Sequence, residues 1–536
     1  MDKKVNQWLE SEQKKAFDYL YSQDFKFSES QNIYYKKITF NSRKIDLKVL
    51  IPNEYPLKYP KFYIDDKSWH LTYPHIEEYK TSIGSSICYL EDEDKVPVMD
   101  GATIIKNELT RILSIIDEYH NNTFQKDDFL LEFDSYWSDE IIYLDLYNQL
   151  QEAQILKISN VKKFGRVIST NIDNTINNFT VLNHEITKTE DILFLPFSNY
   201  ISYPLPTTYS KIMNIIRELG YEDFLRTNIN KYKMSKVVLF SFFIGKEIHF
   251  GTFTLHSIKN VVPKLLPDYD IKKGRVKRID RERIFTRGGN NLTRDISMNE
   301  ITVGVIGCGS LGGSLAFKLA KSGVKNFILI DKDFLDIGNI ARHICGMKYF
   351  KLSKVEAIKM LILEHFPDCN IEISNQDAID SLELIDKANL IVSAIGSEGN
   401  IFEHFFSQLN DRPKIFTWFE ADIAGQIIFT KSKIEDFNKL TSKIRVTKEE
   451  YISSLSKNDI GCNSMFTPYS FIDAENTVNH VARFITNFIS KKGNLKEEVW
   501  TIFGDNELNK DKIEVEYQDS PAFSIKKRPL LGLTDD

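Results

Sequence analysis

The sequence predicts a multidomain protein of α/β and α+β class. Its 536 residues exceed the size of one ordinary domain, and two stretches follow different patterns. Near the N-terminus a helical pattern leads into alternating strands and a later helix, as in an α+β domain. Near the C-terminus β-branched, strand-like runs alternate with helical runs, as in an α/β domain. We therefore expect three domains, over 1–150, 151–294 and 295–536, with an α/β linker domain in the middle.

A glycine loop is the clearest motif of the C-terminal domain. The run TVGVIGCGSLGGSLAFKLAKSGVKNFILIDKD places Gly307, Gly309 and Gly312 in G-x-G-x-x-G spacing between a strand-like run and a helix. The next strand-like run ends at Asp331. Glycine lets the backbone approach phosphate oxygens, and an acidic residue at the next strand end accepts ribose hydroxyl groups. We expect a mononucleotide or dinucleotide site on a Rossmann-like unit.

Polar residues after Asp331 narrow the type of nucleotide enzyme. The run DKDFLDIGNIARHICGMKYFKLSKVEA supplies Asp333, Asn339, Arg342 and Lys354, the last at the start of a helical pattern. This series resembles the ThiF/MoeB family of ATP-dependent activating enzymes, and implies a ThiF-type adenylation domain over 295–536. The resemblance implies that Asp331 holds the ATP ribose. It also implies that Asn339, Arg342 and Lys354 contact the phosphates and offset the charge that moves onto pyrophosphate. Ordinary surface cations are the alternative for Arg342 and Lys354.

The magnesium ligand departs from the pattern of that family. The family carries an aspartate after the fourth strand, where this chain reads NLIVSAIGSEGN and has Gly396. Glu398 or Asp333 could serve instead, because Mg²⁺ usually keeps several waters beside one or two carboxylates. ATP and Mg²⁺ are the expected cofactors, and the metal ligand stays open.

Composition and charge restrict the class of protein. The net charge of −6, from 69 basic and 75 acidic residues, argues against a nucleic-acid partner, although the run from Lys272 to Arg294 is locally basic. No apolar run approaches the ~20 residues that span a bilayer. We expect a cytoplasmic protein with no membrane partner.

The five cysteines form no CxxC pair, so no zinc site is expected.

Cys462 lies in the polar segment SKNDIGCNSMFTPYS, ahead of a helical pattern that begins near Asp473. In conjugating relatives of the activating family a catalytic cysteine follows the adenylation residues, and Cys462 is the best match by position. A helix N-terminus could favour its thiolate. A structural thiol is the alternative.

The first 150 residues resemble the ubiquitin-conjugating-enzyme family. A helical pattern from about Asn6 to Tyr21 precedes strands, a Tyr-Pro…Pro element, the run IGSSICYL and a late helix. The resemblance implies that Cys88 is a thioester cysteine, with a buried strand cysteine as the alternative. The usual His-Pro-Asn is replaced by Tyr-Pro-His-Ile. His75 or a backbone N–H could therefore be the oxyanion donor, or His75 could be a hydrogen-bonded structural histidine.

The middle segment, 151–294, shows strand-like runs and a helical pattern but no motif that indicates a chemical role.

The combined domain order resembles the fusion enzymes of bacterial CBASS anti-phage operons. That resemblance implies that the C-terminus of a partner protein, a cGAS-like nucleotidyltransferase or a ubiquitin-like protein, is adenylated and loaded onto Cys462. The resemblance implies that the acyl group then passes to Cys88 and from there to a target amine. It also implies that the activating domain forms a homodimer. Three alternatives remain: an NAD(P)-dependent oxidoreductase, a ThiF/MoeB-like enzyme that adenylates a sulfur carrier or peptide, and a non-enzymatic docking scaffold.

Overall fold

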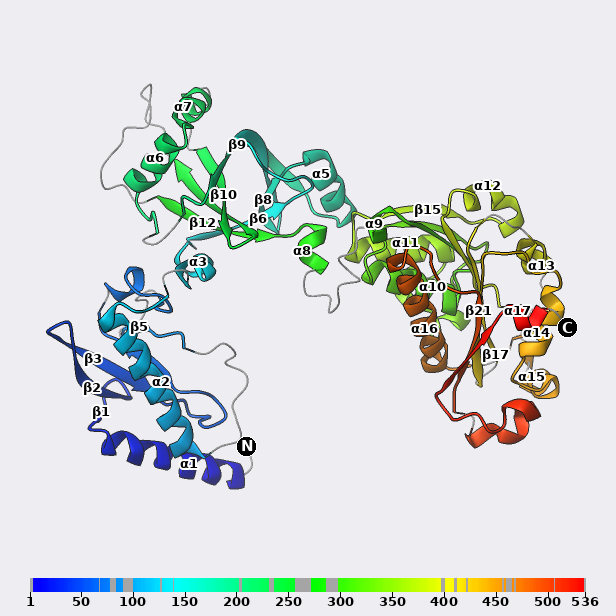
Figure 1. Ribbon diagram of the computed structural model, residues 1–536, viewed down its shortest axis with the longest axis horizontal. Helices are drawn as coiled ribbons and strands as arrows, with labels where there is room; N and C mark the ends of the chain where they lie inside the picture. Colours follow the sequence, from blue (N-terminus) through cyan, green and yellow to red (C-terminus); the bar gives the residue numbers. More distant parts are fainter. Residues whose placement is uncertain are drawn as a thin grey trace. The chain divides into compact units, whose positions relative to one another are not determined.

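The computed structural model describes residues 3–66, 68–77, 83–89, 100–125, 128–137, 139–201, 205–230, 236–255, 271–285, 297–396, 401–408, 412–420, 423–455, 457–458, 465–466, 469–505 and 507–534. The chain divides into two compact units (Figure 1). Unit 1 comprises Met1–Asn171 and Ile186–Arg278, and unit 2 comprises Ile172–Glu185 and Ile279–Asp536. No helix of the described segments combines the length and apolar content required to cross a bilayer.

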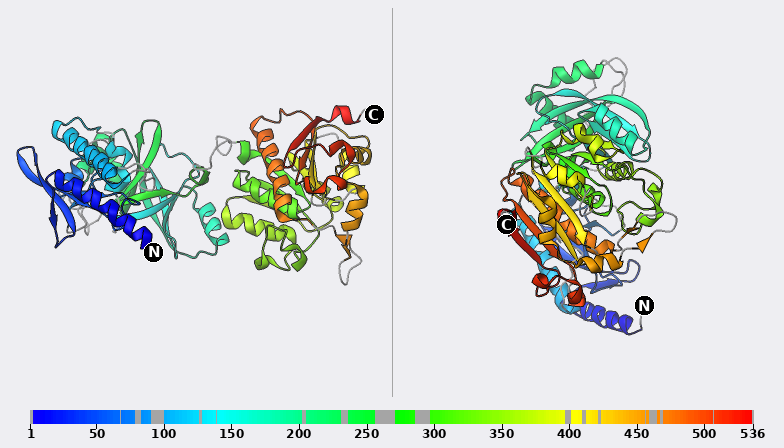
Figure 2. Two further views of the ribbon diagram at one scale, coloured as in Figure 1. Left: turned by 90° about the horizontal axis from the view of Figure 1, so that it is seen from below. Right: turned by 90° about the vertical axis from the view of Figure 1, so that its right-hand side faces the viewer.

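Unit 1 begins with an α+β domain that has the expected order of elements. Two long helices lie side by side, and a five-stranded antiparallel sheet runs in chain order (Figure 2). The predicted helix over 6–21 is observed as α1. The elements are α1 Lys3–Ser22, β1 Lys26–Ser28, β2 Ile33–Phe40, β3 Arg43–Leu50, β4 Lys61–Ile64, η1 Trp69–Leu71, β5 Ser85–Ser86 and α2 Gly101–Asn121. Asp100 caps α2, because its carboxylate accepts the N–H groups of Ala102 and Thr103.

The rest of unit 1 is a closed barrel in the strand order β10-β11-β12-β6-β8-β7-β9. The sequence predicts an α/β domain here. The strands are interleaved with helices and include parallel pairs, but closure depends on pairing between distant segments such as β12 with β6. The strands are β6 Glu140–Asp145, β7 Gln154–Val161, β8 Gly165–Ser169, β9 Ile186–Ser198, β10 Lys236–Ile244, β11 Glu247–Leu255 and β12 Lys272–Arg278. The helices are α5 Ile172–Val181, which is grouped with unit 2, α6 Tyr209–Glu218 and α7 Glu222–Asn230.

Two short helices, α3 Asp128–Leu131 and α4 Phe133–Tyr136, precede the barrel. The Phe133 ring packs on Phe242 with centroids 4.6 Å apart, and the fully buried Trp137 donates its indole N–H to the Thr252 carbonyl at 2.7 Å. A buried indole N–H usually finds such a partner. The α3–α4 turn is therefore anchored on the barrel.

Unit 2 is built on an eight-stranded sheet in the order β15-β14-β13-β16-β17-β18-β21-β22. The first five strands are parallel, and the last three add antiparallel pairs. The strands are β13 Thr302–Ile306, β14 Asn326–Ile330, β15 Asn370–Ser374, β16 Leu390–Ser393, β17 Lys414–Glu420, β18 Ala424–Thr430, β21 Glu498–Phe503 and β22 Ile525–Pro529. The central parallel strands are apolar almost throughout, as strands covered on both faces must be.

Helices cover both faces of this sheet (Figure 2). One core lies under α10, α11 and α16, and another under α12, α13 and α14, because alternate strand residues point to opposite faces. The helices are α8 Arg281–Phe285, α9 Ser297–Glu300, α10 Ser310–Lys321, α11 Lys354–His365, α12 Leu382–Ile385, α13 Ile401–Ser407, α14 Phe437–Ile444, α15 Glu449–Leu455, α16 Phe471–Ser490 and α17 Leu531–Thr534. Short elements are η3 Ile337–Asn339, η4 Met347–Tyr349, η5 Ala378–Ser381, η6 Glu507–Lys512, η7 Val515–Tyr517, β19 Lys457–Asn458 and β20 Met465–Phe466.

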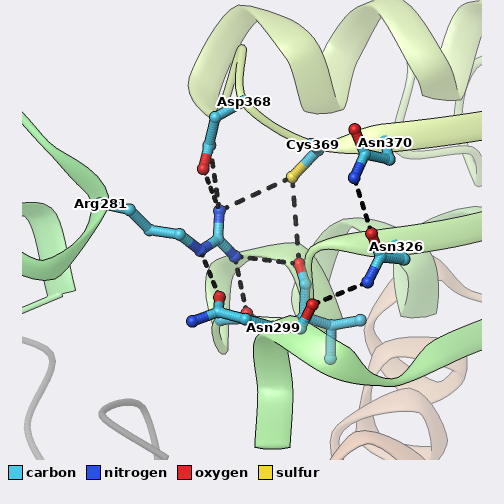
Figure 3. A network of polar contacts seen from close by, with 8 residues as sticks. Arg281, Asn299, Asn326, Asp368, Cys369 and Asn370 are labelled. Atoms are coloured by element: carbon cyan, nitrogen blue, oxygen red, sulfur yellow. Dashed lines mark hydrogen bonds and ion pairs between the residues drawn. The ribbon is translucent and has the colours of Figure 1, made fainter. Parts of the chain in front are cut away.

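An arginine network fixes α8 and α9 at the edge of the sheet where the parallel strands begin (Figure 3). The Arg281 guanidinium contacts Asp368 at 3.0 Å, the Asn299 side chain at 2.8 Å and the Gly323 carbonyl at 2.6 Å. Asn326, the first residue of β14, donates to the Asn299 carbonyl. Within the locally basic run, Arg281 therefore has a structural role in the fold.

Candidate functional site

The glycine loop lies at the carboxyl ends of the parallel strands. Gly307 follows β13, Asp331 follows β14, and Gly396 comes shortly after β16. The chain proceeds from β13 to β14 and β15 on one side, and then to β16 on the other. Such a change of direction leaves a crevice at the strand ends, where α/β proteins bind nucleotides.

The three predicted glycines meet different demands. Gly307 has φ +84°, and a Cβ there would lie 2.8 Å from the Ala394 carbonyl oxygen. A Cβ at Gly312 would lie 1.9 Å from the Gly307 oxygen, so α10 could not pack against the loop. At Gly309 no described residue beyond its chain neighbours comes within 4 Å of the added atom. Two glycines therefore serve backbone packing, and Gly309 leaves open space at the start of α10.

Asp331 is joined to the loop by hydrogen bonds. Its carboxylate accepts the Cys308 N–H at 2.7 Å and the Asp333 N–H at 2.8 Å, and its side chain is 9% exposed. Burial raises the pKa of Asp331, which nearby Lys354 partly opposes. The carboxylate is thus held in a fixed orientation at the strand end, where a ribose hydroxyl could donate to it.

Lys354 supplies positive charge beside this carboxylate. It opens α11, as predicted, and its ammonium group lies 2.7 Å from Asp333 Oδ2 and 4.0 Å from Asp331 Oδ1. Only 12% of its side chain is exposed, whereas Asp333 is 57% exposed. A capping box of Ser353 and Glu356 fixes the start of the helix, and with it the lysine.

Arg342 and Asn339 follow in the loop after β14. The Arg342 guanidinium lies 5.5 Å from the centroid of the Tyr469 ring, and the Tyr469 hydroxyl hydrogen-bonds Ser310 at the start of α10. The Asn339 Oδ1 accepts the Asp336 N–H at 3.1 Å within a capping box. That bond leaves the amide Nδ2 of Asn339 as the group that could donate to a ligand.

A buried histidine joins this loop to the glycine loop. His343 Nε2 lies 2.8 Å from the Cys308 carbonyl oxygen, and Nδ1 lies 3.1 Å from the Cys345 nitrogen. A carbonyl only accepts and an amide N–H only donates, so Nε2 carries the proton and Nδ1 is bare. Burial lowers the pKa of His343, and the charges of Lys354 and Arg342 lower it further.

The region after β16 contains the departure from the metal-binding pattern. Gly396 is exposed, has φ +77° and supplies no side-chain ligand, and Glu398 lies outside the described residues. Within the described segments, Asp333 is the predicted carboxylate that could hold Mg²⁺, together with phosphate oxygens and water. This oxygen donor beside the nucleotide loop fits the chemistry of the ion.

A buried carboxyl group lies near the same strand end. Glu403 of α13 accepts the Ser393 hydroxyl at 2.5 Å, and both residues are almost wholly buried. Burial raises the pKa of Glu403 to about 7, and the serine hydrogen bond acts in the opposite direction. Burial therefore makes Glu403 a much weaker acid than an exposed glutamate.

In unit 1, Cys88 adjoins the segment that replaces the usual His-Pro-Asn. The Cys88 N–H donates to the His75 carbonyl at 2.7 Å, and a bridge joins Ile76 to Ile87. Cys88 is half-buried. The two predicted residues thus lie side by side.

Carboxylates surround the His75 ring. Nδ1 lies 2.7 Å from Glu132 Oε1, Nε2 lies 3.3 Å from Asp128 Oδ2, and Glu132 also accepts the His75 N–H. His75 has φ +59°, which is uncommon for a residue other than glycine. The Glu132 hydrogen bond raises the pKa of His75, although burial opposes the shift. Both ring nitrogens are therefore occupied, as in a structural histidine.

The described cysteines are of two kinds. Cys308, Cys345 and Cys369 are buried, which raises the pKa of Cys345 to about 12, that of Cys369 to about 11 and that of Cys308 well above its ordinary value. Cys88 is more exposed. Cys462 lies outside the described residues.

Sequence reasoning missed the residues that support these sites, which are His343, Tyr469, Glu403, Asp128 and Glu132. His343 directly follows Arg342, and that position could have directed attention to it. For Asp128 and Glu132 no sequence signal was present, because each lies more than fifty residues along the chain from the histidine it contacts.

Two family models match the chain. Residues 282–397 match the ThiF family, and residues 13–143 match Prokaryotic E2 family B. The chain therefore carries a ThiF family domain and a prokaryotic E2-like domain. The first contains the glycine loop, Asp331 and Lys354, and the second contains Cys88 and His75.

Curated relatives match over short segments. A probable molybdopterin-synthase adenylyltransferase of Porphyra purpurea is 33% identical over 98 residues, which are 18% of this chain and 26% of that protein. Ubiquitin-like modifier-activating enzyme 5 of Caenorhabditis elegans is 36% identical over 78 residues, 15% and 19% of the two chains. A tRNA threonylcarbamoyladenosine dehydratase of Bacillus subtilis is 34% identical over 76 residues, 14% and 30%. The chain thus spans less than a third of the length of these relatives.

Solved structures are more distant. E. coli MccB with ATP is 18% identical, with a TM-score of 0.30 over 45% of this chain and 66% of that one. MccB with AMPCPP and MccA is 15% identical, with a TM-score of 0.32 over 70% and 96%.

Proposed function

We propose that the chain is an ATP-dependent protein-activating and protein-conjugating enzyme. The ThiF domain adenylates the C-terminal carboxylate of a partner protein, and Cys462 takes the acyl group as a thioester. Cys88 of the E2-like domain receives it and delivers it to a target amine. The supporting observation is that one chain combines the Asp331–Lys354 glycine-loop site with a half-buried Cys88 in a separate domain of conjugating type.

The described side chains suit the adenylation step. A carboxylate oxygen of the partner attacks the α-phosphorus, and the bond from that phosphorus to pyrophosphate breaks. Lys354 and Arg342 offset the charge that collects on the leaving pyrophosphate, because positive charge fixed in place costs little reorganisation. Asp331 orients the ribose. Asp333 would hold Mg²⁺, which when bound would further neutralise the phosphate oxygens.

The acyl group then moves through three substitutions. The Cys462 thiolate attacks the acyl-adenylate, and AMP leaves. The Cys88 thiolate attacks the resulting thioester and releases the Cys462 thiolate. The target amine attacks the Cys88 thioester, loses a proton as the amide forms, and releases the Cys88 thiolate. Together, the three substitutions replace one difficult condensation with several easier steps.

The oxyanion of the last step requires a donor. Because Glu132 and Asp128 occupy both ring nitrogens of His75, we assign that role to a backbone N–H near Cys88 rather than to the imidazole. His75 instead accepts the Cys88 N–H with its carbonyl and holds that loop.

The partner follows from the resemblance to CBASS fusion enzymes. We propose that the activated protein is a cGAS-like nucleotidyltransferase of an anti-phage operon, that the activity serves antiviral defence, and that the ThiF domain is a homodimer. The two matched domains, in this order within one chain, support that assignment.

Partner-stimulated exchange of pyrophosphate into ATP tests the first step. Wild-type protein with a neighbouring operon protein should exchange label, and Cys462→Ala should exchange as well, because the thiol acts after adenylation. Thioester bands that disappear with reductant should require Cys462 and then Cys88. A wild-type protein that shows no exchange with any genomic neighbour would contradict the proposal and favour a docking scaffold.

One alternative is an adenylating enzyme for a sulfur carrier or peptide. The short match to a molybdopterin-synthase adenylyltransferase favours it. Such an enzyme would need no Cys88, so product formation by a Cys88→Ala variant at the wild-type rate would select this alternative.

A further inference from the structure

The glycine loop of unit 2 is held at one residue from two sides. The Cys308 N–H donates to Asp331, and the Cys308 carbonyl accepts from His343. In a trans peptide the carbonyl and the following N–H point in opposite directions. The Cys308 carbonyl faces His343, so the N–H of Gly309 points away from the histidine. Apart from its two chain neighbours, no atom of the described residues lies within 4 Å of the position that a Cβ on Gly309 would take.

His343 also belongs to the cation-bearing loop after β14. Its N–H and that of Arg342 both donate to the Asn339 carbonyl, at 2.9 and 3.0 Å. Its ring packs against α10 at Gly313, where an added Cβ would lie 3.3 Å from Nε2. The side chain is almost wholly buried. The His343 ring thus connects the glycine loop with Asn339 and Arg342, two of the three residues predicted to contact phosphate.

We propose that His343 is a positioning residue for the nucleotide, which fixes the Cys308–Gly309 peptide so that the Gly309 N–H faces the ATP phosphates beside Arg342. This inference deepens the proposed function, on which it rests for the identity of the nucleotide. His343 touches no reacting atom itself.

The role requires the neutral ring. A proton on Nδ1 would face the Cys345 N–H, so that two donors would oppose each other. The charges around the ring are Lys354 and Arg342, and both disfavour a third cation. The thiols of Cys308 and Cys345 stay protonated, because burial raises their pKa values. Acid should therefore weaken ATP binding as His343 gains a proton below its ordinary pKa of about 6.5.

Equilibrium binding of ATP to the full chain tests this inference without any partner protein. Glutamine can donate to the Cys308 carbonyl but does not titrate. We expect His343→Gln to bind within about threefold of wild type near neutral pH, whereas His343→Leu should lose about tenfold or more, because it leaves two backbone groups unpaired. The ratio of wild-type to His343→Gln affinity should fall as the pH is lowered through the acid range.

Two further variants show whether a loss of ATP affinity reflects the missing hydrogen bond or a misfolded protein. His343→Asn retains an acceptor near the position of Nδ1 but is too short to reach the Cys308 carbonyl, so it should bind ATP more weakly than His343→Gln. His365→Gln is the matched control. It removes an exposed ring that contacts the Leu361 carbonyl at 3.0 Å in the same unit, and it should change nothing.

The outcomes separate this inference from the proposed function. Wild-type affinity and an unchanged pH profile in His343→Asn and His343→Leu would overturn the role of His343. Equal losses in His343→Gln and His343→Leu, with no change in the pH ratio, would reduce the ring to a packing element and also overturn it. ATP binding that follows the expected series, with no pyrophosphate exchange by any partner, would uphold the positioning role while contradicting the proposed function.

Discussion

Replacing Lys354 with methionine should remove most of the affinity for ATP. The ammonium group lies 4.0 Å from Asp331 Oδ1, and only 12% of the lysine side chain is exposed. Two unit charges at that distance interact by about 4 kcal/mol at an effective dielectric constant of about 20. Phosphates bound nearby would lose a similar attraction and would face the remaining carboxylates. We expect a loss of about 100- to 1,000-fold in affinity, equal to about 3–4 kcal/mol.

The chain offers a close control for this experiment. Lys332 directly follows Asp331 on the same loop and pairs with Asp377 at 2.8 Å, but its side chain is 65% exposed. Exposed pairs contribute about 0–1 kcal/mol. Lys332→Met should therefore change the affinity for ATP by less than about fivefold.

Isothermal titration of the full chain with ATP and Mg²⁺ measures both variants. In the Lys354→Met background, Asp333→Asn should not restore the affinity, because that carboxylate is proposed to hold Mg²⁺ beside the phosphates. Near-wild-type affinity in Lys354→Met, or an equal loss in Lys332→Met, would refute the assignment of Lys354 to the nucleotide site.

Three further predictions concern the loop, the histidine cluster and the thiols. Gly312→Ala should abolish ATP binding and lower the melting temperature, because its Cβ would lie 1.9 Å from a backbone oxygen, whereas Gly309→Ala should fold normally and lose only ATP affinity. His75 has a raised pKa and Glu132 a lowered one, so their stabilisation should be lost as the pH rises through the His75 pKa, and also as acid protonates Glu132. Urea unfolding across pH should show both losses, and Glu132→Gln should flatten the profile. Iodoacetamide followed by peptide mass spectrometry should label Cys88 far faster than the buried cysteines.

The nucleotide-binding unit could be predicted because its signals are local. The apolar run before Gly307, the glycine spacing and the helical pattern after it all lie within one strand–loop–helix unit. The lysine at the start of α11 is also a local feature, since Ser353 and Glu356 form a capping box that can be recognised in the sequence. Short-range periodicity was therefore sufficient for these elements.

The supporting contacts could not be predicted because they join distant parts of the chain. His343 lies 35 residues from the carbonyl it contacts, and Glu132 lies 57 residues from His75. Closure of the barrel similarly depends on the pairing of its first strand along the chain, β6, with its last, β12. Periodicity reports which face of an element is buried, but it does not report which partner covers that face.

The central claim is that an acyl group activated at the ThiF domain reaches Cys88. A Cys88→Lys variant, coexpressed with its genomic neighbours, places an amine where the thioester would form, and an amine traps the acyl group as a stable amide. Denaturing electrophoresis with reductant, followed by mass spectrometry, should identify the C-terminus of a neighbour joined to position 88. That adduct should disappear in a Cys462→Ala background. Active adenylation of the same neighbour without any adduct at position 88 would contradict the claim and leave the E2-like domain as a docking module.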